Sequence, residues 1–500
     1  MDYKKLQNGS DIRGVALEGI EGQHVNLTET VCRDIGRGFA LWLINKTNKK
    51  DLKVAVGRDS RLSGEQLSNW ICSAMVESGL HVTDFGMAST PAMFMATVTK
   101  GYEFDGTIMI TASHLPFNRN GFKFFTSLGG LEKEDIKQIL AYAESDAKTN
   151  LPKGDIVDGE FMDAYSNILV NKIKSATGED MPLLGFKIVV DAGNGAGGFY
   201  VDKVLKPLGA NTDGSRFLEP DGSFPNHIPN PENKEAMESI TQAVKENNAD
   251  LGIIFDTDVD RAGAVLSDGS ELNRNRIIAM LSAILLREHP GTTIVTDSIT
   301  STGLAKFIKE KGGIHHRFKR GYRNVINESI RLNSLGQDSQ LAIETSGHGA
   351  LKENYFLDDG AYLVTKLLIE LARGKKEGYT LASLIDSLEE PKESVEFRMN
   401  ILLDDFKAYG QKVIDDLNEY AKSTCGFSLA SDNYEGVRVN LSKENGDGWF
   451  LLRLSLHDPL LPLNIESNTV GGAKIIATKL FEFIKNYDKL DFNSLENFIK

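Results

Sequence analysis

The sequence predicts an α/β protein of several domains, and two observations carry this prediction. Short apolar runs alternate with segments of helical periodicity over the first three quarters of the chain, a pattern typical of helices packed on largely parallel sheets. The chain has 500 residues, more than one hydrophobic core normally supports. We therefore expect three related α/β domains with mostly parallel sheets, followed by a C-terminal α+β domain, around a central cleft.

The repeating unit is an apolar strand followed by a polar or glycine-rich loop. Four such strands are expected, at residues 54–56, 188–190, 294–296 and 341–343. A helix near 64–78 follows the first, and the glycine-rich loop 191–195 follows the second. Ligands of α/β sheets collect at the carboxyl ends of strands, so these loops are where we expect the functional residues.

Turn-forming stretches near residues 149–155, 289–291 and 389–391 interrupt this pattern and suggest boundaries. The expected domains are 1–154, which carries a serine loop, 155–289 with a metal site, 290–391 with a sugar site, and 392–500. The last domain lacks the repeating unit. In it we expect helices over 402–422 and 474–486, and strands over 437–441 and 449–456.

Composition excludes several classes of protein. The formal charge of −14 comes from 70 acidic and 56 basic side chains, which argues against a nucleic-acid binder. Three cysteines without C-x-x-C spacing predict neither disulfides nor zinc, and favour a reducing cytoplasm. The apolar segment 277–286 is too short to cross a bilayer and reads as a buried helix. No secretory signal is visible at the start, so a soluble, cytoplasmic protein without a membrane partner is expected.

Ser113 stands in a loop after the apolar run 106–110 and before Pro116. It is either an ordinary turn serine or an exposed nucleophile. The neighbouring His114 invites a hydrolase interpretation, but the G-x-S-x-G elbow of that class is missing. Lys123 lies within plausible reach of the same site. As a general base it would need a pKa lowered by nearby cations such as Arg13.

Three carboxylates at alternate positions follow the apolar run 251–255: Asp256, Asp258 and Asp260, with Arg261 next. Clustered carboxylates repel one another unless a cation lies among them, and a cage of carboxylate oxygens suits Mg²⁺. An EF-hand would need glycine and glutamate where Arg261 and Ser267 stand. A phosphatase that forms an aspartyl phosphate typically has threonine or valine at position 260.

Taken together, these motifs resemble the α-D-phosphohexomutase superfamily, the phosphoglucomutase and phosphomannomutase enzymes. The resemblance covers nearly the whole chain and keeps the family's motif order. The similar segments are 11–14, the phosphoserine loop 111–116, the magnesium loop 256–261, the variable specificity loop 319–323 and the sugar-binding loop 344–348. Loop 58–61 also resembles the family's sequence. Arg61 in this loop would either support the serine loop or form a surface ion pair.

The resemblance implies a mechanism. Phosphorylated Ser113 would give its phosphate to a hexose 1- or 6-phosphate, and a hexose 1,6-bisphosphate would be intermediate and activator. The sugar would then turn over and return its other phosphate. Mg²⁺ would be held by the three aspartates and the phosphate on Ser113. The catalytic residues it implies are Ser113, Lys123, Arg13, His348 and Arg261. Lys123 or His348 would carry the proton, unless His348 is only a structural loop residue.

The implied substrate-binding residues lie in the third and fourth domains: Glu344, Ser346, Gly321, Tyr322, Arg323, Arg453, Ser455 and His457. Thr345 or Ser346 could instead cap a helix. The fourth domain departs from the family's phosphate loop, because its glycine–threonine pair is missing and Pro462 stands where a further arginine is usual. Asp458 is expected to point away from the phosphate or to orient Arg453.

Activity on glucose and mannose phosphates is the expectation. The alternatives are a phosphoglucosamine mutase, a phosphatase that works through Asp256, and a silent paralogue that binds sugar phosphates. A small-molecule sugar phosphate is the expected partner, and the protein is expected to be a monomer or a homodimer.

Overall fold

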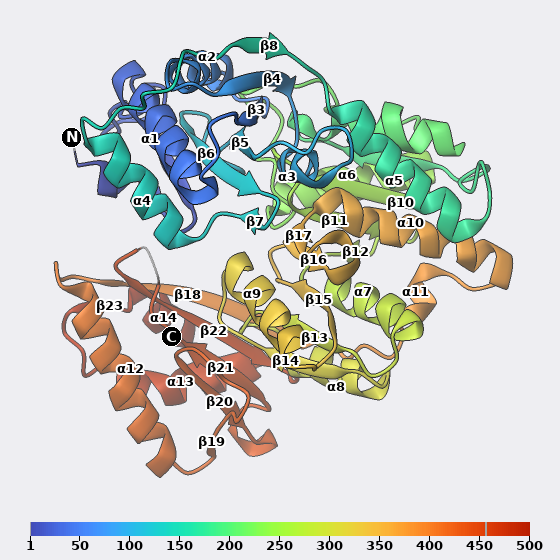
Figure 1. Cartoon of the computed structure of the whole chain (residues 1–500). Coiled ribbons are helices and arrows are strands. Elements are labelled where there is room, and N and C mark those ends of the chain that lie inside the picture. The colour runs from blue at the N-terminus through green and yellow to red at the C-terminus, as the bar shows by residue number, and fades with distance from the viewer. Residues whose placement is uncertain (1, 456–457) are drawn as a thin grey trace. The chain divides into compact units, whose positions relative to one another are not determined.

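The computed structural model describes residues 2–455 and 458–500 (Figure 1). The chain divides into two compact units. Unit 1 comprises the residues up to Ile284 together with Ser346–Leu384, and unit 2 comprises Leu285–Thr345 and the described part of Ile385–Lys500. The chain therefore passes between the units three times. The expected division into four domains stays a prediction.

The first sheet of unit 1 has the strand order β1-β2-β6-β5-β3-β4-β8, with β7 beside β6. Its strands are β1 (Gln7–Asn8), β2 (Asp11–Val15), β3 (Lys53–Arg58), β4 (His81–Met87), β5 (Gly106–Ile110), β6 (Arg119–Thr126), β7 (Gly129–Gly130) and β8 (Ile156–Asp158). Strands β5, β3, β4 and β8 run parallel, whereas β1, β2, β6 and β7 pair antiparallel. The sheet is therefore mixed, with the expected parallel arrangement in its β5–β8 half.

Helices cover both faces of this sheet: α1 (Glu29–Thr47), α2 (Gly64–Glu77), α3 (Thr90–Val98) and α4 (Lys133–Glu144). Alternate side chains of β3 and β5, such as Val54 and Ile108, share one core with α1, α2 and α4, as the period of two requires. On the opposite face Thr107 Oγ1 donates to the carbonyl oxygen of Met93 in α3. The expected helix near 64–78 is confirmed as α2.

The second sheet of unit 1 has the order β12-β11-β10-β9. Its strands are β9 (Ile188–Asp191), β10 (Leu251–Phe255), β11 (Ala262–Leu266) and β12 (Glu271–Leu272), of which only β9 and β10 pair in parallel. The other α-helices and strands that lie within unit 1 are α5 (Met162–Thr177), α6 (Lys234–Asn247), α10 (Gly360–Glu377), α11 (Leu381–Leu384) and the antiparallel pair β16 (Gly349–Leu351) and β17 (Leu357–Asp358). Helix α7 (Arg274–Glu288) passes from unit 1 to unit 2, and its residues 277–286 are buried as expected.

Unit 2 contains a parallel sheet of β14 (Ile314–Arg317), β13 (Thr293–Thr296) and β15 (Ser339–Ile343), with α8 (Thr302–Glu310) and α9 (Tyr322–Ser334). Its second sheet is antiparallel, in the order β19-β20-β21-β22-β18-β23. The strands are β18 (Glu393–Ile401), β19 (Phe427–Leu429), β20 (Val437–Leu441), β21 (Gly448–Leu452), β22 (Leu460–Ser467) and β23 (Leu490–Asp491). The helices beside it are α12 (Phe406–Ser423), α13 (Gly472–Ile484) and α14 (Asn493–Ile499). This is the expected α+β part. The α/β fold class is confirmed, but the second sheet of unit 1 is mostly antiparallel where a mostly parallel sheet was expected.

Two element boundaries in this part differ from expectation for local reasons. Helix α12 begins at Phe406 and not at Leu402, because the Asp405 side chain caps it by accepting from Ala408 N. Helix α13 begins at Gly472, where the Glu393 carboxylate accepts from Gly471 N and Ala473 N. Both starts are set by a carboxylate at the helix N-terminus and not by the apolar period.

A buried arginine joins the two sheets of unit 2. The Arg438 guanidinium of β20 lies 3.6 Å from the centroid of the Trp449 ring in β21. Its Nη atoms donate to the carbonyl oxygens of Ser298 and Thr300, at 2.7 and 3.0 Å, in the loop after β13. Burial is the main cause that lowers the pKa of Arg438 well below its usual value. Its hydrogen bonds and the ring offset part of that desolvation.

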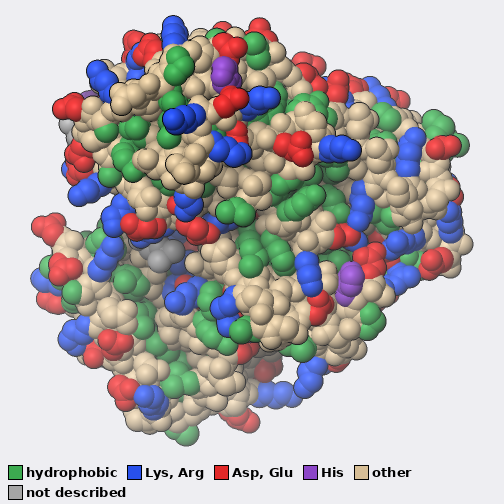
Figure 2. Space-filling view, in the orientation of Figure 1, with side chains coloured by type: hydrophobic (Ala, Val, Ile, Leu, Met, Phe, Trp, Pro, Cys, Tyr) green, Lys and Arg blue, Asp and Glu red, His purple; other side chains and the backbone are tan. Residues whose placement is uncertain are grey.

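The visible surface carries interspersed acidic and basic side chains (Figure 2). Such mixing agrees with the modest excess of acid in the sequence. Within the described residues, no helix combines the length and the apolar character that a membrane span requires.

Candidate active site

The serine loop begins where β5 ends. Ser113 has a φ of 51°, in the left-handed region that costs a non-glycine residue about 1 kcal/mol or more. The conformation is fixed locally, because Thr111 Oγ1 accepts from Ser113 N at 2.8 Å and donates to Asp59 Oδ2 at 2.6 Å. Ser113 is 2% exposed, so the expectation of an exposed position is wrong. A residue held in a strained, buried turn is not an ordinary turn serine.

Arg61 holds the whole serine loop in place. Its guanidinium donates to four backbone carbonyl oxygens, those of Ser113, Leu115 (2.6 Å), Pro116 (2.8 Å) and Arg119 (2.9 Å). Its Nε lies 3.4 Å from Asp59 Oδ2, and both side chains are fully buried. The interpretation of Arg61 as part of a surface ion pair is therefore wrong. Arg61 instead supports the serine loop.

The aspartate loop follows β10, and its three carboxylates converge. Asp256, Asp258 and Asp260 are buried, and one oxygen of each lies within 4.8 Å of the others, so they form a group that could hold a metal ion. Asp258 Oδ1 and Asp260 Oδ1 are buried and have no hydrogen-bond partner among the described residues. Buried anionic oxygens without donors are costly, and a divalent cation would satisfy them.

The serine and aspartate loops meet in unit 1. Ser113 Oγ donates to Asp256 Oδ2 at 2.9 Å. Burial, then Asp260 and Asp258, raise the pKa of Asp256 well above its usual value. Burial alone would also raise the pKa of Asp260, but Lys123, His348 and Arg261 outweigh it and hold that pKa below its usual range. Cations therefore adjoin the three carboxylates.

Lys123 and Arg13 lie on neighbouring strands, and Lys123 contacts this group. Lys123 Nζ is 3.0 Å from Asp258 Oδ2 and forms an ion pair with Asp260. Arg13 stands on β2, opposite Gly121 of β6, and its Nη2 is 2.8 Å from Asp11 Oδ2. The structure thus places the Lys123 ammonium on the carboxylates that form the candidate metal site, where it supplies positive charge.

His348 and Arg261 complete the charged cluster. A backbone bridge pairs the two residues, and Arg261 Nε lies 3.7 Å from Asp256 Oδ2. His348 Nδ1 is 2.5 Å from Asp358 Oδ2 and 3.9 Å from Asp260 Oδ1. Burial by itself lowers the pKa of His348, but the Asp358 carboxylate outweighs it and the net pKa is raised. His348 thus joins the cluster and is not merely a loop histidine distant from it.

His114 does not behave as the base of a hydrolase. Its Nδ1 is 3.4 Å from Ser113 Oγ, longer than the bond from Ser113 to Asp256. Arg261 is the largest cause, and burial the second, of a His114 pKa of about 2. An imidazole with so low a pKa is too weak a base to take a serine proton. The geometry therefore argues against a Ser–His hydrolase.

Sequence reasoning missed three residues that support the site. Thr90, the first residue of α3, donates through Oγ1 to Asp258 Oδ2, and its backbone N donates to the Asp258 carbonyl at 2.8 Å. Asp358 orients His348. Gly195 packs on the aspartate loop, because an added Cβ would lie 2.7 Å from the Thr257 carbonyl oxygen. The available signals were the Ser-Thr-Pro helix start at 89–91 and the glycine-rich loop 191–195.

The predicted sugar-binding residues divide between the units. In unit 2, Glu344 lies at the end of β15, and its Oε1 accepts from Gly321 N at 2.6 Å. Tyr322 and Arg323 begin α9, directly after Gly321 with its φ of 113°. In unit 1, Ser346 is buried, and its Oγ has no hydrogen-bond partner among the described residues. No helix begins at 345–346, so the helix-cap alternative is wrong.

The predicted phosphate loop follows β21 in unit 2. Arg453 lies directly after the strand and Ser455 two residues later, so the strand ends earlier than the expected 456. Ser455 Oγ accepts from Asp458 N at 3.2 Å. Asp458 therefore contacts Ser455 through its backbone. His457 lies outside the described residues.

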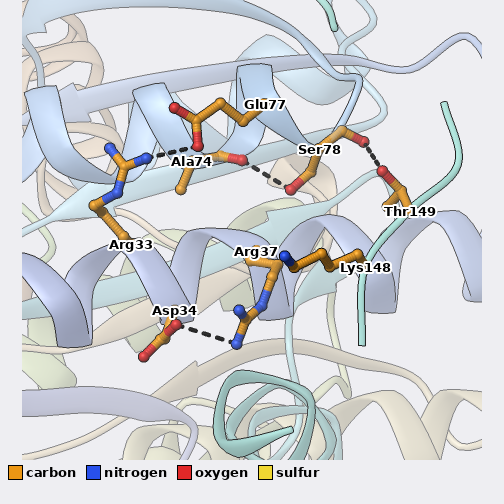
Figure 3. Close-up of a pocket in the computed structure, with 8 residues that line it drawn as sticks. All are labelled: Arg33, Asp34, Arg37, Ala74, Glu77, Ser78, Lys148 and Thr149. Atoms are coloured by element: carbon orange, nitrogen blue, oxygen red, sulfur yellow. Dashed lines mark hydrogen bonds and ion pairs between the residues drawn. The ribbon is translucent and has the colours of Figure 1, made fainter. Parts of the chain in front are cut away.

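A separate surface pocket of about 390 Å³ lies beside α1 and α2 (Figure 3). Two of its cations already have partners. Arg33 Nη2 is 2.6 Å from Glu77 Oε2, and Arg37 pairs with Asp34 at 3.1 Å. None of the predicted site residues lines this pocket.

Comparison with known proteins agrees with the motifs. Models of the phosphoglucomutase/phosphomannomutase α/β/α domains I, II and III match residues 4–150, 160–269 and 273–390. A phosphoglucomutase of Neisseria gonorrhoeae is 32% identical over 94% of this chain and 95% of its own length. A phosphomannomutase/phosphoglucomutase of Pseudomonas putida is 32% identical over 83% of this chain and 84% of its own.

Solved structures agree as well. A phosphoglucomutase/phosphomannomutase family protein from Burkholderia thailandensis superposes with a TM-score of 0.79 at 28% identity, covering 98% of this chain and 100% of its own. Domain matches, sequence identity over nearly the full length and fold therefore point to one family. The chain belongs to the phosphoglucomutase/phosphomannomutase family of isomerases.

Proposed function

We propose that this protein is a phosphohexomutase that interconverts hexose 1-phosphate and hexose 6-phosphate, acts on glucose and mannose phosphates, and carries the transferred phosphoryl group on Ser113. The observation that carries the proposal is the 2.9 Å hydrogen bond between Ser113 Oγ and Asp256 Oδ2. It places a serine hydroxyl directly on the carboxylate group that could hold a metal. Family membership supports the reaction class.

Mg²⁺ fits this group of residues. Asp256, Asp258 and Asp260 would hold it, because carboxylate oxygens are the ligands that Mg²⁺ prefers and two of these oxygens have no donor. When bound, the ion would neutralise charge on the phosphoryl group carried by Ser113. The group formed by Asp260, His348 and Asp358 includes an imidazole, which Mg²⁺ binds less readily.

The surrounding residues have separate tasks. Arg261, Lys123 and Arg13 supply fixed positive charge to the transferred group in a buried setting, where such charge is most effective. As the bond from Ser113 Oγ to phosphorus breaks, a sugar hydroxyl oxygen forms the new bond and releases its proton. His348, which is hydrogen-bonded through Nδ1 to Asp358, would take this proton, with Lys123 as the other candidate. The product of the first transfer is a hexose 1,6-bisphosphate, which also serves as activator.

Substrate recognition falls to Glu344, Ser346 and the loop Gly321–Arg323, with Arg453, Ser455 and His457 for the second phosphate. The sugar must bind in two opposite orientations. A carboxylate and a hydroxyl suit this, because they can accept from or donate to adjacent sugar hydroxyls in either orientation. The Ser346 Oγ, buried without a described partner, is available for such a bond.

The decisive experiment combines a coupled mutase assay with mapping of the phosphate by mass spectrometry. We expect interconversion of glucose and of mannose phosphates in the presence of Mg²⁺ and hexose 1,6-bisphosphate, a phosphate on Ser113, and no turnover by S113A. A hydroxylamine-labile phosphate on Asp256 would instead identify a phosphatase. Turnover of glucosamine 6-phosphate alone would overturn the proposed substrates, and binding without isomerisation would identify a silent paralogue.

A further inference from the structure

His227 is buried in unit 1, outside the group of predicted site residues. Its Nε2 lies 3.0 and 3.1 Å from the two carboxylate oxygens of Asp191, the last residue of β9. Its Nδ1 lies 3.0 Å from the carbonyl oxygen of Ile228. Both ring nitrogens therefore face acceptors, and a ring nitrogen that faces an acceptor must carry a hydrogen. The geometry thus makes His227 an imidazolium with both nitrogens protonated.

Asp191 accepts from three parts of unit 1. Besides His227, its Oδ1 accepts from Gly193 N at 2.9 Å, and its Oδ2 accepts from the Ser239 hydroxyl of α6 at 2.7 Å. Asp191 is fully buried, and a buried carboxylate is costly unless donors and a cation satisfy it. His227 supplies that cation. The ion pair therefore joins the glycine-rich loop to the segment that contains His227.

Two further contacts hold these two segments together. Asn226 Nδ2 donates to Asn194 Oδ1 at 2.8 Å. Gly193 leaves no room for a side chain, because an added Cβ would lie 2.7 Å from Pro229 Cβ and 3.2 Å from His227 Cε1. The two segments are therefore in direct contact, and the His227 ring lies at that contact.

Each of the two segments also contacts the aspartate loop. Directly after the glycine-rich loop, Ala196 N donates to the Thr257 carbonyl oxygen at 2.8 Å. In the other segment, residues 226–232, Glu232 Oε2 lies 3.9 Å from Arg261 Nη1. Positions 257 and 261 adjoin the first and the last of the three aspartates. A displacement of either segment would therefore act on the carboxylates that could hold the metal.

We propose that His227 is a positioning residue for the magnesium site. As an imidazolium bound to Asp191, it fixes the two segments that contact the aspartate loop, and it thereby strengthens Mg²⁺ binding without touching the ion or the substrate. The inference rests on the magnesium site of the proposed function. It adds a residue whose position in the sequence is at least 29 places from any of the three aspartates.

This role depends on the charge of His227 and hence on pH. The carboxylate of Asp191 binds the imidazolium, and that of Glu235 also raises its pKa. Arg216, in the segment whose aromatic ring lies 5.5 Å from the imidazole, pairs with Glu246. Burial by itself lowers the pKa of His227, but the carboxylates and the neighbouring carbonyl outweigh it, and the net pKa is raised. The charge is therefore fully present below about pH 6.5 and is lost as pH rises through the folded-state pKa.

The test measures Mg²⁺ binding to the full chain by isothermal titration calorimetry, which needs no turnover. We expect H227Q to raise the Kd for Mg²⁺ by about three- to tenfold near pH 6, less than is typical for a residue that contacts a metal ligand directly. The KM for glucose 1-phosphate should change less. H81Q is the matched control, because it breaks an exposed histidine–aspartate pair with Asp155 in the same unit. It should bind Mg²⁺ as the wild type does.

A pH series then tests the charge itself. The ratio of the Kd values of H227Q and the wild type cancels the titration of the metal-binding carboxylates, which both proteins share. We expect this ratio to approach one as pH rises through the folded-state pKa of His227, because the wild type then loses the imidazolium that H227Q lacks at every pH.

The outcomes separate this inference from the proposed function. Equal Kd values for H227Q and the wild type near pH 6, an equal loss in H81Q, or a ratio that does not change with pH would each overturn the role of His227. If H227Q does not fold, N226A decides: it removes only the exposed side chain that contacts Asn194, and an unchanged Kd would overturn the inference. A wild-type chain that binds Mg²⁺ without interconverting hexose phosphates overturns the proposed function and leaves the role of His227 in place. A wild-type chain that binds no Mg²⁺ overturns the metal site and this inference together.

Discussion

Ser113 and Asp256 are 143 positions apart in the chain and are joined by a hydrogen bond from Ser113 Oγ to Asp256 Oδ2 of 2.9 Å. The two residues follow β5 and β10, strands of different sheets in unit 1. Both loops leave the carboxyl end of an apolar strand, which is where α/β sheets place ligands. The contact therefore brings the nucleophile and the acidic group together within a single compact unit.

Replacement of Asp256 by asparagine should weaken metal binding. The variant keeps the size of the side chain and can still accept from Ser113, but it removes one of three clustered charges. We expect the Mg²⁺ concentration for half-maximal mutase activity to rise by about tenfold or more, equivalent to roughly 1.4 kcal/mol. D268N, which alters an aspartate of the β11–β12 turn, is the matched control. Equal Mg²⁺ requirements in the two variants would contradict the assignment.

Arg61→Ala should destabilise unit 1 and disable the serine loop. It leaves four carbonyl oxygens without their donor and a buried Asp59 without its cation. Loss of one partner of a buried ion pair typically costs about 3–5 kcal/mol, measurable by urea denaturation. R33A, which breaks a partly exposed pair with Glu77, should cost less than about 1 kcal/mol. Similar losses in both variants would show that the Arg61 contacts contribute little.

Gly195→Ala tests whether the glycine-rich loop supports the metal site. The added Cβ would lie 2.7 Å from the Thr257 carbonyl oxygen, and Ala196 N donates to that same oxygen at 2.8 Å. The aspartate loop must therefore shift, and the three carboxylates with it. We expect a higher Mg²⁺ requirement and a lower kcat, with the thermal midpoint less affected than activity. Retention of wild-type Mg²⁺ dependence would show that the loop tolerates the displacement.

The ion pair of His227 and Asp191 predicts a pH-dependent stability. His227 Nε2 lies 3.0 Å from Asp191 Oδ1. Burial alone lowers the pKa of His227, but Asp191 outweighs it, so the pKa in the folded protein is raised. Its stabilisation is complete below the unfolded-state pKa of about 6.5 and is lost as pH rises through the higher folded-state value. The free energy of unfolding should fall over that window, and H227Q should remove this slope.

The apolar strands could be predicted because their burial is encoded locally. Residues 54–56, 188–190 and 341–343 all lie within strands, since short apolar runs flanked by polar loops favour buried strands. The edge strands β7, β8 and β12 have only two or three residues, too few to show a period. The start of α12 was missed because the Asp405 cap, and not the apolar period, sets it.

The site could be predicted from the sequence only where its functional side chains lie close together along the chain. The alternate spacing of Asp256, Asp258 and Asp260 indicates a metal site directly from the sequence. The role of Arg61 could not be predicted in this way, because its four carbonyl partners are recognisable only once residues 113–119 fold back over it. Thr90 and Asp358 were missed for the same reason, since each acts on a residue far along the chain or across a hairpin.

The stack of Arg438 on Trp449 has a practical consequence. Trp449 is the one tryptophan in the sequence of unit 2, whereas Trp42 and Trp70 belong to unit 1. In a chain with phenylalanine at positions 42 and 70, all indole emission comes from a ring covered by a guanidinium and hydrogen-bonded to Glu466. Separation of the two sheets would hydrate that ring and shift its emission to longer wavelengths. Unit 2 therefore contains its own fluorescent reporter.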